Sequence, residues 1–555
     1  MKREHVGNSG STIRVCIKRI SCVHIHALSI SFAEFTFEVK SAMRIYISLL
    51  FIVNRIFMQA QITELYKNNQ TPTYFEVIEY YRELTDKHPE TKLRACGPTD
   101  SGYPLHIFII DKEGDFDPQK SRLKGKSILL INNGIHPGEP DGIDASIKLT
   151  DAILNKKDPS FRIDNLVICI IPVYNIDGAL NRNATSRVNQ NGPESFGFRG
   201  NGQNYDLNRD FIKCDALNAQ SFTEMFRIWN PDLFVDTHVS NGADYQYVMT
   251  LIETQKDKLT PPLGDYLHNT VSPHLYAAME QAGYPMCPYV NEFDKIPDNG
   301  IVEFMDYGRY STGYAALFNT IGFMPETHML KPYEQRVEST YQLLKTFVNF
   351  VNDHASEIIN VRKEAVNATI HAKDFPIDYT LDKKDPSSFL FRGYEAKYKT
   401  SEVSGLERLY YDRNAPYEKN IPFYNNYLVA KHISAPKAYI IPQAWRHVIS
   451  RLQLNNVVLS RFEKDSSLEV EVYYIENVKT TSSAYEGHYL HTEVRVRKVK
   501  ETVLMHKGDY MILLDQEANR YIVECLEPEA PDSYFAWNFF DAILMQKEWF
   551  SDYVF

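Results

Sequence analysis

The chain has 555 residues, of which 44% are hydrophobic and 24% are charged, as in ordinary globular proteins. It is too long for one simple hydrophobic core, so we expect two domains after any leader. The formal net charge of −11 argues against nucleic acid as a partner, because a phosphate backbone requires a basic surface.

The first 60 residues have the organisation of a leader. An arginine follows Met43, residues 45–53 are apolar, and the small-residue site "MQAQ" comes next, which is the order found in secretory signals. An asparagine and an arginine interrupt this pattern, and a buried segment of the fold is the alternative. We predict a signal peptide from Met43 to Ala60, with residues 1–42 outside the mature protein. The expected location is the periplasm or the extracellular space, with no stable membrane span after signal removal.

Residues 61–368 alternate between short apolar runs and helix-like stretches. This alternation indicates an α/β domain in which helices cover a sheet, with sites expected in the loops that follow strand ends. The predicted strands are "LHIFII" (105–110), "SILLINN" (127–133), "LVICIIPVYN" (166–175), "DLFVDTH" (232–238) and "NTIGFMPETHM" (319–329). The predicted helices are "GIDASIKLTDAIL" (142–154), "SFTEMFRIW" (221–229) and one long stretch, residues 333–359.

From residue 369 to 555 the pattern changes. Residues 467–479, 491–503 and 508–528 alternate with period two and are rich in valine and tyrosine, which is typical of strands. We therefore predict a smaller, β-rich C-terminal domain. Five cysteines follow the leader without any Cys-x-x-Cys pair, which argues against a disulfide framework and a cysteine-based zinc site.

Two His-x-x-Glu pairs occur, His136 with Glu139 and His354 with Glu357. With 17 histidines in the chain, about one chance match is expected. The second pair lies in a continuous helical pattern, where residues three apart are surface neighbours, so we interpret it as a solvated pair. The first pair follows an apolar strand and precedes a helix, where a site is expected.

The first pair offers two ligands of the kind that hydrolytic zinc sites use. Such sites take three nitrogen or oxygen ligands and leave one position open. His238 in "PDLFVDTHVSNG" follows another strand and would complete a set of two histidines and one glutamate, a known catalytic pattern. A hydrogen-bonded core histidine is the alternative for His238 viewed alone.

Two further strand-end stretches carry polar residues. The stretch "NGQNYDLNRDF" places Asp206, Asn208 and Arg209 in one turn, with Arg199 nine residues before Asn208. The stretch "NTIGFMPETHM" places Glu326 after an apolar run. Ordinary turn residues, and a salt-bridged carboxylate at a sheet edge, are the alternatives.

Taken in order, "HPGE", "NIDG", "RGNGQNYDLNRD", "DTH" and "GFMPETHM" resemble the zinc metallocarboxypeptidases of the carboxypeptidase A type, and within them a large exported bacterial branch. The resemblance covers roughly residues 75–365. It implies a three-layer α/β/α fold around a mixed, roughly eight-stranded sheet. It also implies one Zn²⁺ per chain, with His136, Glu139 and His238 as its ligands.

The resemblance further implies catalytic roles. Glu326 matches the family's general base and acid, which takes a proton from water and returns it to the leaving amine. Arg199 matches the arginine that polarises the scissile carbonyl, and Arg187 is the alternative for that role.

The remaining matches concern substrate binding and orientation. Asn208 and Arg209 match the pair that binds the terminal carboxylate of the substrate, for which arginine offers two parallel hydrogen bonds. Asp206 matches the carboxylate that orients His136, as outer partners of metal ligands do.

The chain also departs from the family pattern. Gly138 stands immediately before the glutamate ligand, where the family often has an arginine that contacts substrate. Two tyrosines, Tyr310 and Tyr314, are candidates for the family's mobile tyrosine, and we favour Tyr310. The position that sets the side-chain preference is not located by sequence.

Three functions remain open from sequence. The first is an exported zinc carboxypeptidase that hydrolyses the last peptide bond of peptides and proteins. The second is a zinc amidohydrolase acting on cell-wall peptides or acylated amino acids. The third is a catalytically silent peptide-binding module, which the presence of Glu326 argues against.

Overall fold

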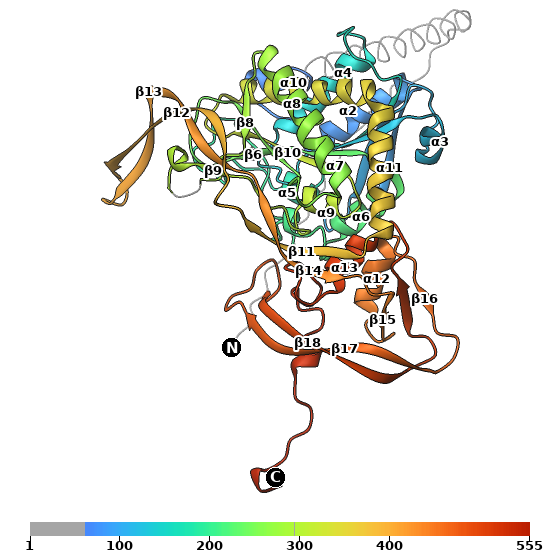
Figure 1. The fold of residues 1–555 in the computed structure, drawn as a ribbon. Coiled ribbons are helices and arrows are strands. Elements are labelled where there is room, and N and C mark those ends of the chain that lie inside the picture. The colour runs from blue at the N-terminus through green and yellow to red at the C-terminus, as the bar shows by residue number, and fades with distance from the viewer. Residues whose placement is uncertain (1–61, 293–294, 555) are drawn as a thin grey trace, which may run out of the picture. The chain divides into compact units, whose positions relative to one another are not determined.

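The computed structural model describes residues 62–292 and 295–554 (Figure 1). The predicted leader, including the signal from Met43 to Ala60, lies outside the described residues. No helix within the described residues is both long and apolar enough to cross a membrane.

A mixed sheet organises the first part of the chain. Its strands follow the order β1–β2–β4–β3–β5–β10–β7–β8, and the short β6 also pairs with β10. Neighbours β4, β3, β5 and β10 run parallel, whereas β1–β2, β2–β4 and β10–β7 are antiparallel. The sheet thus confirms the predicted mixed sheet of about eight strands. The strands are β1 (Thr91–Pro98), β2 (Pro104–Ile110), β3 (Ser127–Asn132), β4 (Leu166–Ile171), β5 (Leu233–Asp236), β6 (His238–Ser240), β7 (Met249–Glu253), β8 (Met286–Pro288) and β10 (Ile321–His328).

The central strands are apolar throughout because both of their faces are buried. In β3, Leu129 and Ile131 belong to one hydrophobic core, whereas Ile128 and Leu130 belong to the core on the opposite face. Strands covered on both sides read as continuous apolar runs. Their ends, where polar residues begin, are therefore sharply defined in the sequence.

Helices cover both faces of the sheet. The residues of the two cores come from different helices, which gives the predicted three layers. Helix α2 begins with a capping box, in which Thr73 and Glu76 bond each other's backbone N–H groups. On one face lie α2 (Tyr74–Lys87), α4 (Asp141–Leu154), α7 (Pro261–Tyr266), α8 (Ser272–Gln281), α10 (Tyr333–Asp353) and α11 (Ala355–His371), and on the other lie α6 (Leu217–Trp229) and α9 (Ser311–Ala316). Two short helices, α3 (Pro118–Leu123) and α5 (Ile176–Leu180), follow β2 and β4.

The long stretch predicted as one helix is two helices. His354 separates α10 from α11, with a non-helical backbone at φ −107° and ψ 15°. Its ring stacks on Phe350 with a centroid distance of 4.5 Å. Its Nδ1 lies 3.0 Å from an Oε2 atom of Glu357, in the first turn of α11. The His354 side chain therefore bridges the helix boundary, which periodicity alone did not reveal.

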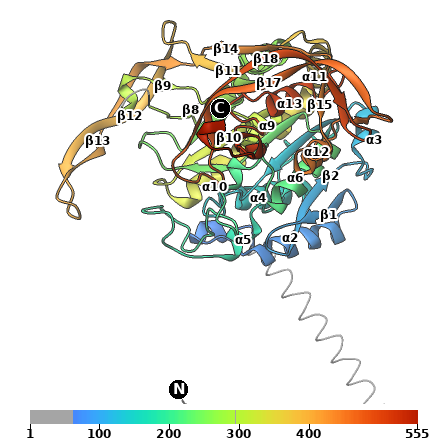
Figure 2. The ribbon, with the colours of Figure 1, turned by 90° about the horizontal axis from the view of Figure 1, so that it is seen from below.

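The C-terminal region is β-rich, as predicted, and consists mainly of hairpins and small sheets (Figure 2). The β12–β13 hairpin extends as an arm in Figure 1, and β13 also pairs with β9 (Ile301–Val302) of the first region. The strands are β11 (Asp374–Leu381), β12 (Ser387–Thr400), β13 (Glu407–Tyr424), β14 (Tyr427–Ser434), β15 (Ala438–Ile441), β16 (Ser460–Arg461), β17 (Ser466–Thr480), β18 (His491–Met505) and β19 (Tyr510–Leu513).

One predicted strand in this region is wrong in its second half. After β19 the chain forms α13 (Asn519–Leu526) instead of continuing with period two. Tyr521, Ile522 and Cys525 are fully buried there, at the spacing of one helix face. Buried neighbours on that face, and not the alternation of residue types, decide the structure of this segment.

The two regions share a hydrophobic core. Leu105 and Phe222 of the first region belong to the same cluster as Leu452, Ile512 and Trp537 of the second. Helix α12 (Arg446–Leu454) packs against α6. Residues Gln61–Phe555 accordingly form one compact unit, and the boundary near residue 368 remains a proposal based on the change in sequence pattern.

Candidate metal centre and substrate cavity

Three side chains from two segments far apart in the sequence meet beyond the ends of the central strands. His136 and Glu139 lie in the loop between β3 and α4, and His238 begins β6. One ligand atom from each lies within 4.8 Å of those of the other two. Each residue is no more than 4% exposed. The structure therefore brings together the three residues that the sequence analysis selected as ligands.

Each histidine turns its Nδ1 toward Glu139. Nδ1 of His136 lies 3.3 Å from Oε1 of Glu139, and Nδ1 of His238 lies 3.2 Å from Oε2. The opposite nitrogens contact carboxylates, because Nε2 of His136 lies 2.8 Å from Asp206 and Nε2 of His238 lies 3.0 Å from Asp236. An outer carboxylate that accepts the Nε2 proton directs the other ring nitrogen toward a metal ion.

This donor set fits a catalytic zinc ion. Two imidazole nitrogens and one carboxylate oxygen are ligands that zinc prefers, and a hydrolytic site needs a further open position. Against the effect of burial, Asp236 and Glu139 raise the pKa of His238 well above its usual value. The same negative charges would favour a bound cation, which displaces protons from its ligands.

Asp236 is a partner that the sequence analysis missed. It precedes His238 by two residues in "DTH", and alternate residues of an extended chain share one face. That spacing was the available signal. Asp236 also accepts a hydrogen bond from Asn132, 2.9 Å away, which fixes the position of its carboxylate.

Arg199 is held beside the first histidine by Asp206. Its Nε and Nη2 donate to Oδ2 of Asp206 over 3.0 and 2.8 Å, and its Nη1 lies 3.2 Å from Nδ1 of His136. Although burial opposes it, His136 and Arg199 hold the pKa of Asp206 well below its usual range. Asp206 therefore remains charged and orients both side chains, which agrees with the role that the resemblance implies.

Arg187 occupies the space beside Gly138. A Cβ atom at Gly138 would lie 2.9 Å from Cδ of Arg187. Arg187 donates to Glu139, to the carbonyl of Val239 over 2.7 Å and to Gln190 over 2.6 Å. Although burial opposes it, Arg187 and then His136 hold the pKa of Glu139 well below its usual range. Arg187, from a distant loop, thus packs against Gly138, the position at which the family often has an arginine.

Glu326 lies on β10 directly beside His238, the predicted ligand on β6. Its Cα pairs with that of His238 in the parallel register and with that of Thr250 in the antiparallel register. Burial, opposed by His238 and reinforced by the charge of Glu139, raises the pKa of Glu326 to about 7. The structure therefore places the predicted base next to the predicted ligands.

The predicted carboxylate clamp faces the same space. Asn208 and Arg209 lie in a short 3₁₀ turn, Leu207–Arg209, and Asp206 caps its start. The guanidinium of Arg209 stacks on the ring of Tyr310, 4.6 Å from its centroid, and Nη1 of Arg209 donates to the carbonyl of Asn208. The same Nη1 lies 3.8 Å from Oδ2 of Asp206, whereas Nε and Nη2 of Arg209 have no hydrogen-bond partner among the described residues.

The two candidate tyrosines differ in their surroundings. Tyr310 lines the cavity that contains the predicted ligands. Tyr314 is fully buried, and its hydroxyl donates to Asn455 over 2.7 Å in the core. This placement favours Tyr310 over Tyr314 as a substrate-binding residue.

A cavity of about 640 Å³ joins these side chains into one site. Of the residues that sequence analysis favoured for the site, Asp206, which lies behind His136, is absent from the lining, as is the alternative tyrosine, Tyr314. The lining includes His136, Glu139, Arg187, Arg199, Asn208, Arg209, His238, Tyr310 and Glu326.

The C-terminal region also reaches this site, which sequence reasoning did not detect. A carboxylate oxygen of Glu486, in the β17–β18 loop, accepts the backbone N–H of Asp206 over 2.7 Å. Nearby, Nε2 of His488 lies 2.8 Å from Asp215. The loop therefore packs against the turn that carries Asp206, and no motif in the sequence links the two segments.

Comparison with known sequences identifies the domain. Residues 77–250 match the sequence model of the peptidase M14 family, described as zinc carboxypeptidase. This segment is therefore similar to the zinc carboxypeptidases, which are metallopeptidases of the hydrolase class. That family implies zinc, for which the buried His–Glu–His set of this chain supplies a site.

The chain also aligns with fungal carboxypeptidases, and these alignments extend well beyond residues 77–250. Carboxypeptidase 2 of Trichophyton equinum is 20% identical over 453 residues, which cover 78% of this chain and 77% of that protein. Carboxypeptidase 2 of Trichophyton rubrum is 21% identical over 451 residues, with the same coverage. These relatives are fungal, so the bacterial branch remains an expectation from the sequence motifs.

Solved carboxypeptidases also align with the domain. A carboxypeptidase A from Helicoverpa armigera aligns at 13% identity over 55% of this chain and 81% of its own, with a TM-score of 0.39. A metallo-carboxypeptidase from Burkholderia cenocepacia aligns at 15% identity over 50% and 68%, with a TM-score of 0.35.

Proposed function

We propose that the protein is an exported, zinc-dependent carboxypeptidase that removes the C-terminal residue from peptides. One observation carries the proposal: the two histidine Nδ1 atoms converge on Glu139 in the cavity that also contains the stacked guanidinium of Arg209. A metal-ligand set suited to hydrolysis and a cationic group suited to a free carboxylate thus share one space.

His136, Glu139 and His238 would hold the zinc ion. When bound, zinc lowers the pKa of water and polarises a carbonyl group as a Lewis acid. Asp206 and Asp236 keep the two imidazoles oriented through their Nε2 atoms, and Arg187 keeps Glu139 in place. The protein thereby fixes the direction of each ligand before substrate arrives.

Glu326 is the proposed general base and acid. It stands beside His238 on the neighbouring strand and lines the cavity. In this role its carboxylate accepts a proton from the attacking water and then gives that proton to the amine of the departing residue. The backbone pairing of β10 with β6 and β7 keeps the carboxylate on a rigid element.

The arginines have different proposed tasks. Arg199 is 44% exposed at its side chain, whereas Arg187 is only 12% exposed. Arg199 is therefore the better candidate for stabilising negative charge on the scissile carbonyl oxygen. Arg209 binds the terminal carboxylate of the substrate through nitrogens that its contact with Asn208 leaves available.

Export is proposed from the leader alone. The sequence from Met43 to Ala60 has the charge, apolar segment and small-residue site of a secretory signal. Determination of the first residue of the protein recovered from cells and from the surrounding medium tests this part. An intact Met43 on the mature protein would contradict it.

A peptide-library digest tests the activity. We expect loss of single residues from free C-termini, no loss after treatment with a strong chelator, and recovery on addition of zinc. Mass spectrometry reads the products, and peptides with amidated C-termini serve as the matched control. Hydrolysis that persists without metal would contradict the zinc role, and cleavage of amidated and free peptides at equal rates would indicate an amidohydrolase instead.

A further inference from the structure

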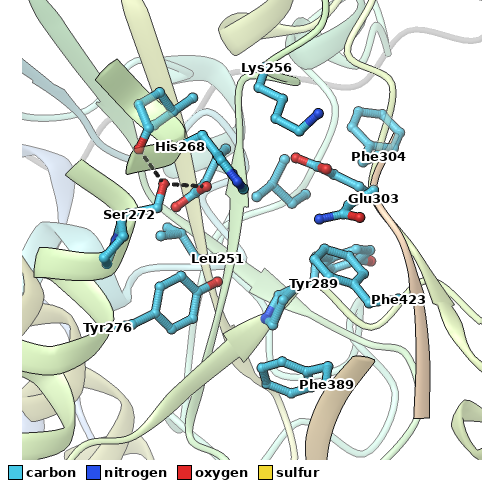
Figure 3. Close-up of a pocket in the computed structure, with 16 residues that line it drawn as sticks. Leu251, Lys256, His268, Ser272, Tyr276, Tyr289, Glu303, Phe304, Phe389 and Phe423 are labelled. Carbon is cyan, nitrogen blue, oxygen red and sulfur yellow. Dashed lines mark hydrogen bonds between the residues drawn. The ribbon is translucent and has the colours of Figure 1, made fainter. Parts of the chain in front are cut away.

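A second cavity, of about 340 Å³, adjoins the catalytic cavity (Figure 3). Three side chains, Ile252, Tyr289 and Phe304, line both spaces. The cavity lies where the pairing of β7 with β8 ends, at Leu251 and Pro288, and both of these residues line it. The two cavities therefore meet at one shared wall.

This wall is connected to the proposed carboxylate clamp by ring contacts. Arg209 stacks on Tyr310, and Tyr310 contacts Phe304 edge-to-face at a centroid distance of 4.8 Å. Glu303, the residue before Phe304, lines only the second cavity. A substrate whose carboxylate lies at Arg209 would therefore have its last side chain beside this wall.

Two carboxyl groups in the second cavity form no ion pair with any residue that the structure describes. The Ser272 hydroxyl donates to Oε2 of Glu253 over 2.7 Å, but Oε1 is buried without a hydrogen-bond partner among the described residues. No side-chain hydrogen bond or ion pair joins Glu303 to any part of the chain that the structure describes. Burial raises the pKa of Glu253 to about 7. Burial and the charge of Glu253, opposed in part by the charge of Lys256, raise the pKa of Glu303 well above its usual value.

The other charged group in the lining is already paired. Nζ of Lys256 lies 2.9 Å from Asp257 and 3.0 Å from the side-chain oxygen of Asn426. His268 is the remaining titratable nitrogen base in the lining. The cavity therefore has an excess of acidic groups, and keeping such groups buried without a cation is costly.

Aromatic rings complete the surroundings of the two acids. Figure 3 shows Tyr276, Phe389 and Phe423 around the cavity together with Glu303. Aromatic faces attract cations, and their flat sides accommodate the methylene chain of a long side chain. The lining thus combines negative charge with apolar contact area, which matches a long cationic side chain better than a small inorganic ion.

We infer that the second cavity receives the lysine or arginine side chain of a peptide's last residue, with Glu303 and Glu253 as its counter-charges. This inference rests on the proposed carboxypeptidase function and assigns its substrate class. It also supplies the specificity position that sequence analysis did not locate.

The test uses peptides that differ only in the last residue: lysine, arginine, norleucine, phenylalanine or glutamate. Norleucine has a linear side chain like that of lysine but no charge. We expect kcat/KM for lysine and arginine to exceed that for norleucine by about tenfold or more, the usual effect of a charge-assisted contact. We expect Glu303→Gln and Glu253→Gln each to remove most of this advantage while leaving norleucine within about threefold.

Glu280→Gln is the matched control, because Glu280 lies on α8 with its side chain 57% exposed on the surface. It should leave the lysine preference unchanged. Circular dichroism and thermal unfolding establish that each variant is folded. Equal kcat/KM for lysine and norleucine in the unaltered enzyme would overturn the cavity assignment while leaving the carboxypeptidase proposal intact.

A binding measurement separates the two proposals if no peptide is hydrolysed. Butylammonium and butylguanidinium are titrated into the unaltered protein and into Glu303→Gln, with butanol as the uncharged control. Binding of the cations that weakens about tenfold or more in the variant supports the cavity assignment even without hydrolysis. Equal binding of all three compounds, or no effect of the substitution, overturns it.

Discussion

The chain contains the same short motif in two regions, with different consequences. Nδ1 lies 3.3 Å from the glutamate oxygen in the His136–Glu139 pair and 3.0 Å in the His354–Glu357 pair. Yet both side chains of the first pair are 3% exposed, whereas those of the second are 34% and 49% exposed. The spacing therefore does not make a site. The first pair differs in having His238 of β6 beside it and carboxylates behind the histidine rings.

The largest effect is expected from removing the histidine of the first pair, and removal of the histidine of the second pair is its control. His136→Ala should lower zinc content and reduce kcat/KM by more than the roughly 100-fold that loss of an outer partner can cost. His354→Ala should leave both within about twofold, because an exposed ion pair contributes less than about 1 kcal/mol. Elemental analysis and peptide hydrolysis measure the two quantities. Similar losses in both variants would remove the distinction between the pairs.

Glu326→Gln tests the proposed general base independently of the proposed metal site. The substitution keeps the shape of the side chain but removes its ability to accept a proton. We expect zinc content to be unchanged and kcat to fall by about 100-fold to 10,000-fold, the range of general acid–base catalysis. Turnover at the unaltered rate would exclude Glu326 as the base and leave the ligand set untouched.

Arg209→Ala tests whether the cavity that contains the predicted metal ligands recognises the terminal carboxylate of a peptide. We expect kcat/KM on peptides with free C-termini to fall by about 100-fold, because a charge-assisted contact is lost. Residual cleavage of amidated peptides should change little. Steady-state rates on matched free and amidated pairs provide the comparison, and equal losses on both would argue against a clamp.

Asp236→Asn tests the carboxylate that contacts Nε2 of His238. The exposed pair, His354 with Glu357, has no such outer carboxylate among the contacts of the described residues. Loss of this outer carboxylate should weaken zinc binding by about 10-fold to 100-fold. Competition with a chelator of known affinity measures the change. The exposed Glu357→Gln is the matched control, and an Asp236 variant with unaltered zinc affinity would show that the histidine needs no such partner.

The smallest effect is expected at the contact from the C-terminal region. Glu486→Ala removes the acceptor for the backbone N–H of Asp206. A hydrogen bond to a charged group is worth about 1.5–3 kcal/mol at most sites, but water can reach part of this loop, so we expect about a fivefold loss of kcat/KM. Glu486→Gln retains an acceptor oxygen, so its kcat/KM should be close to that of the unaltered protein. A loss that Glu486→Gln fails to recover would indicate a broader disturbance of the loop.

Sequence predicted much of the fold because the strands near the site are buried on both faces. Strands β3 and β10 follow from their apolar runs, and the polar residues at their ends mark the site directly. The break at His354 and the helix α13 were not predicted, because both depend on buried neighbours and not on periodicity. Local pattern fails where distant packing determines the backbone.

The site was predicted to a similar degree and for similar reasons. The residues in short motifs were found, including Glu326 and Asn208. The contact of Arg187 with Glu139 and that of Glu486 with Asp206 join segments 48 and 280 residues apart. The two acids of the second cavity belong to no motif at all. Such pairings depend on the folded chain, so single-sequence reasoning has no signal for them.

The pairing of β9 with β13 has a practical consequence for anyone who wishes to shorten this protein. Ile301 and Val302 hydrogen bond to the end of the long C-terminal arm, and Glu303 follows them directly. Removing the β12–β13 arm alone would release the backbone that carries Glu303 and Phe304. Because the rest of the C-terminal region shares the core of the first region, such a variant is expected to keep the proposed metal ligands in place and to lose the proposed discrimination among substrates. Size reduction and selectivity are therefore coupled here.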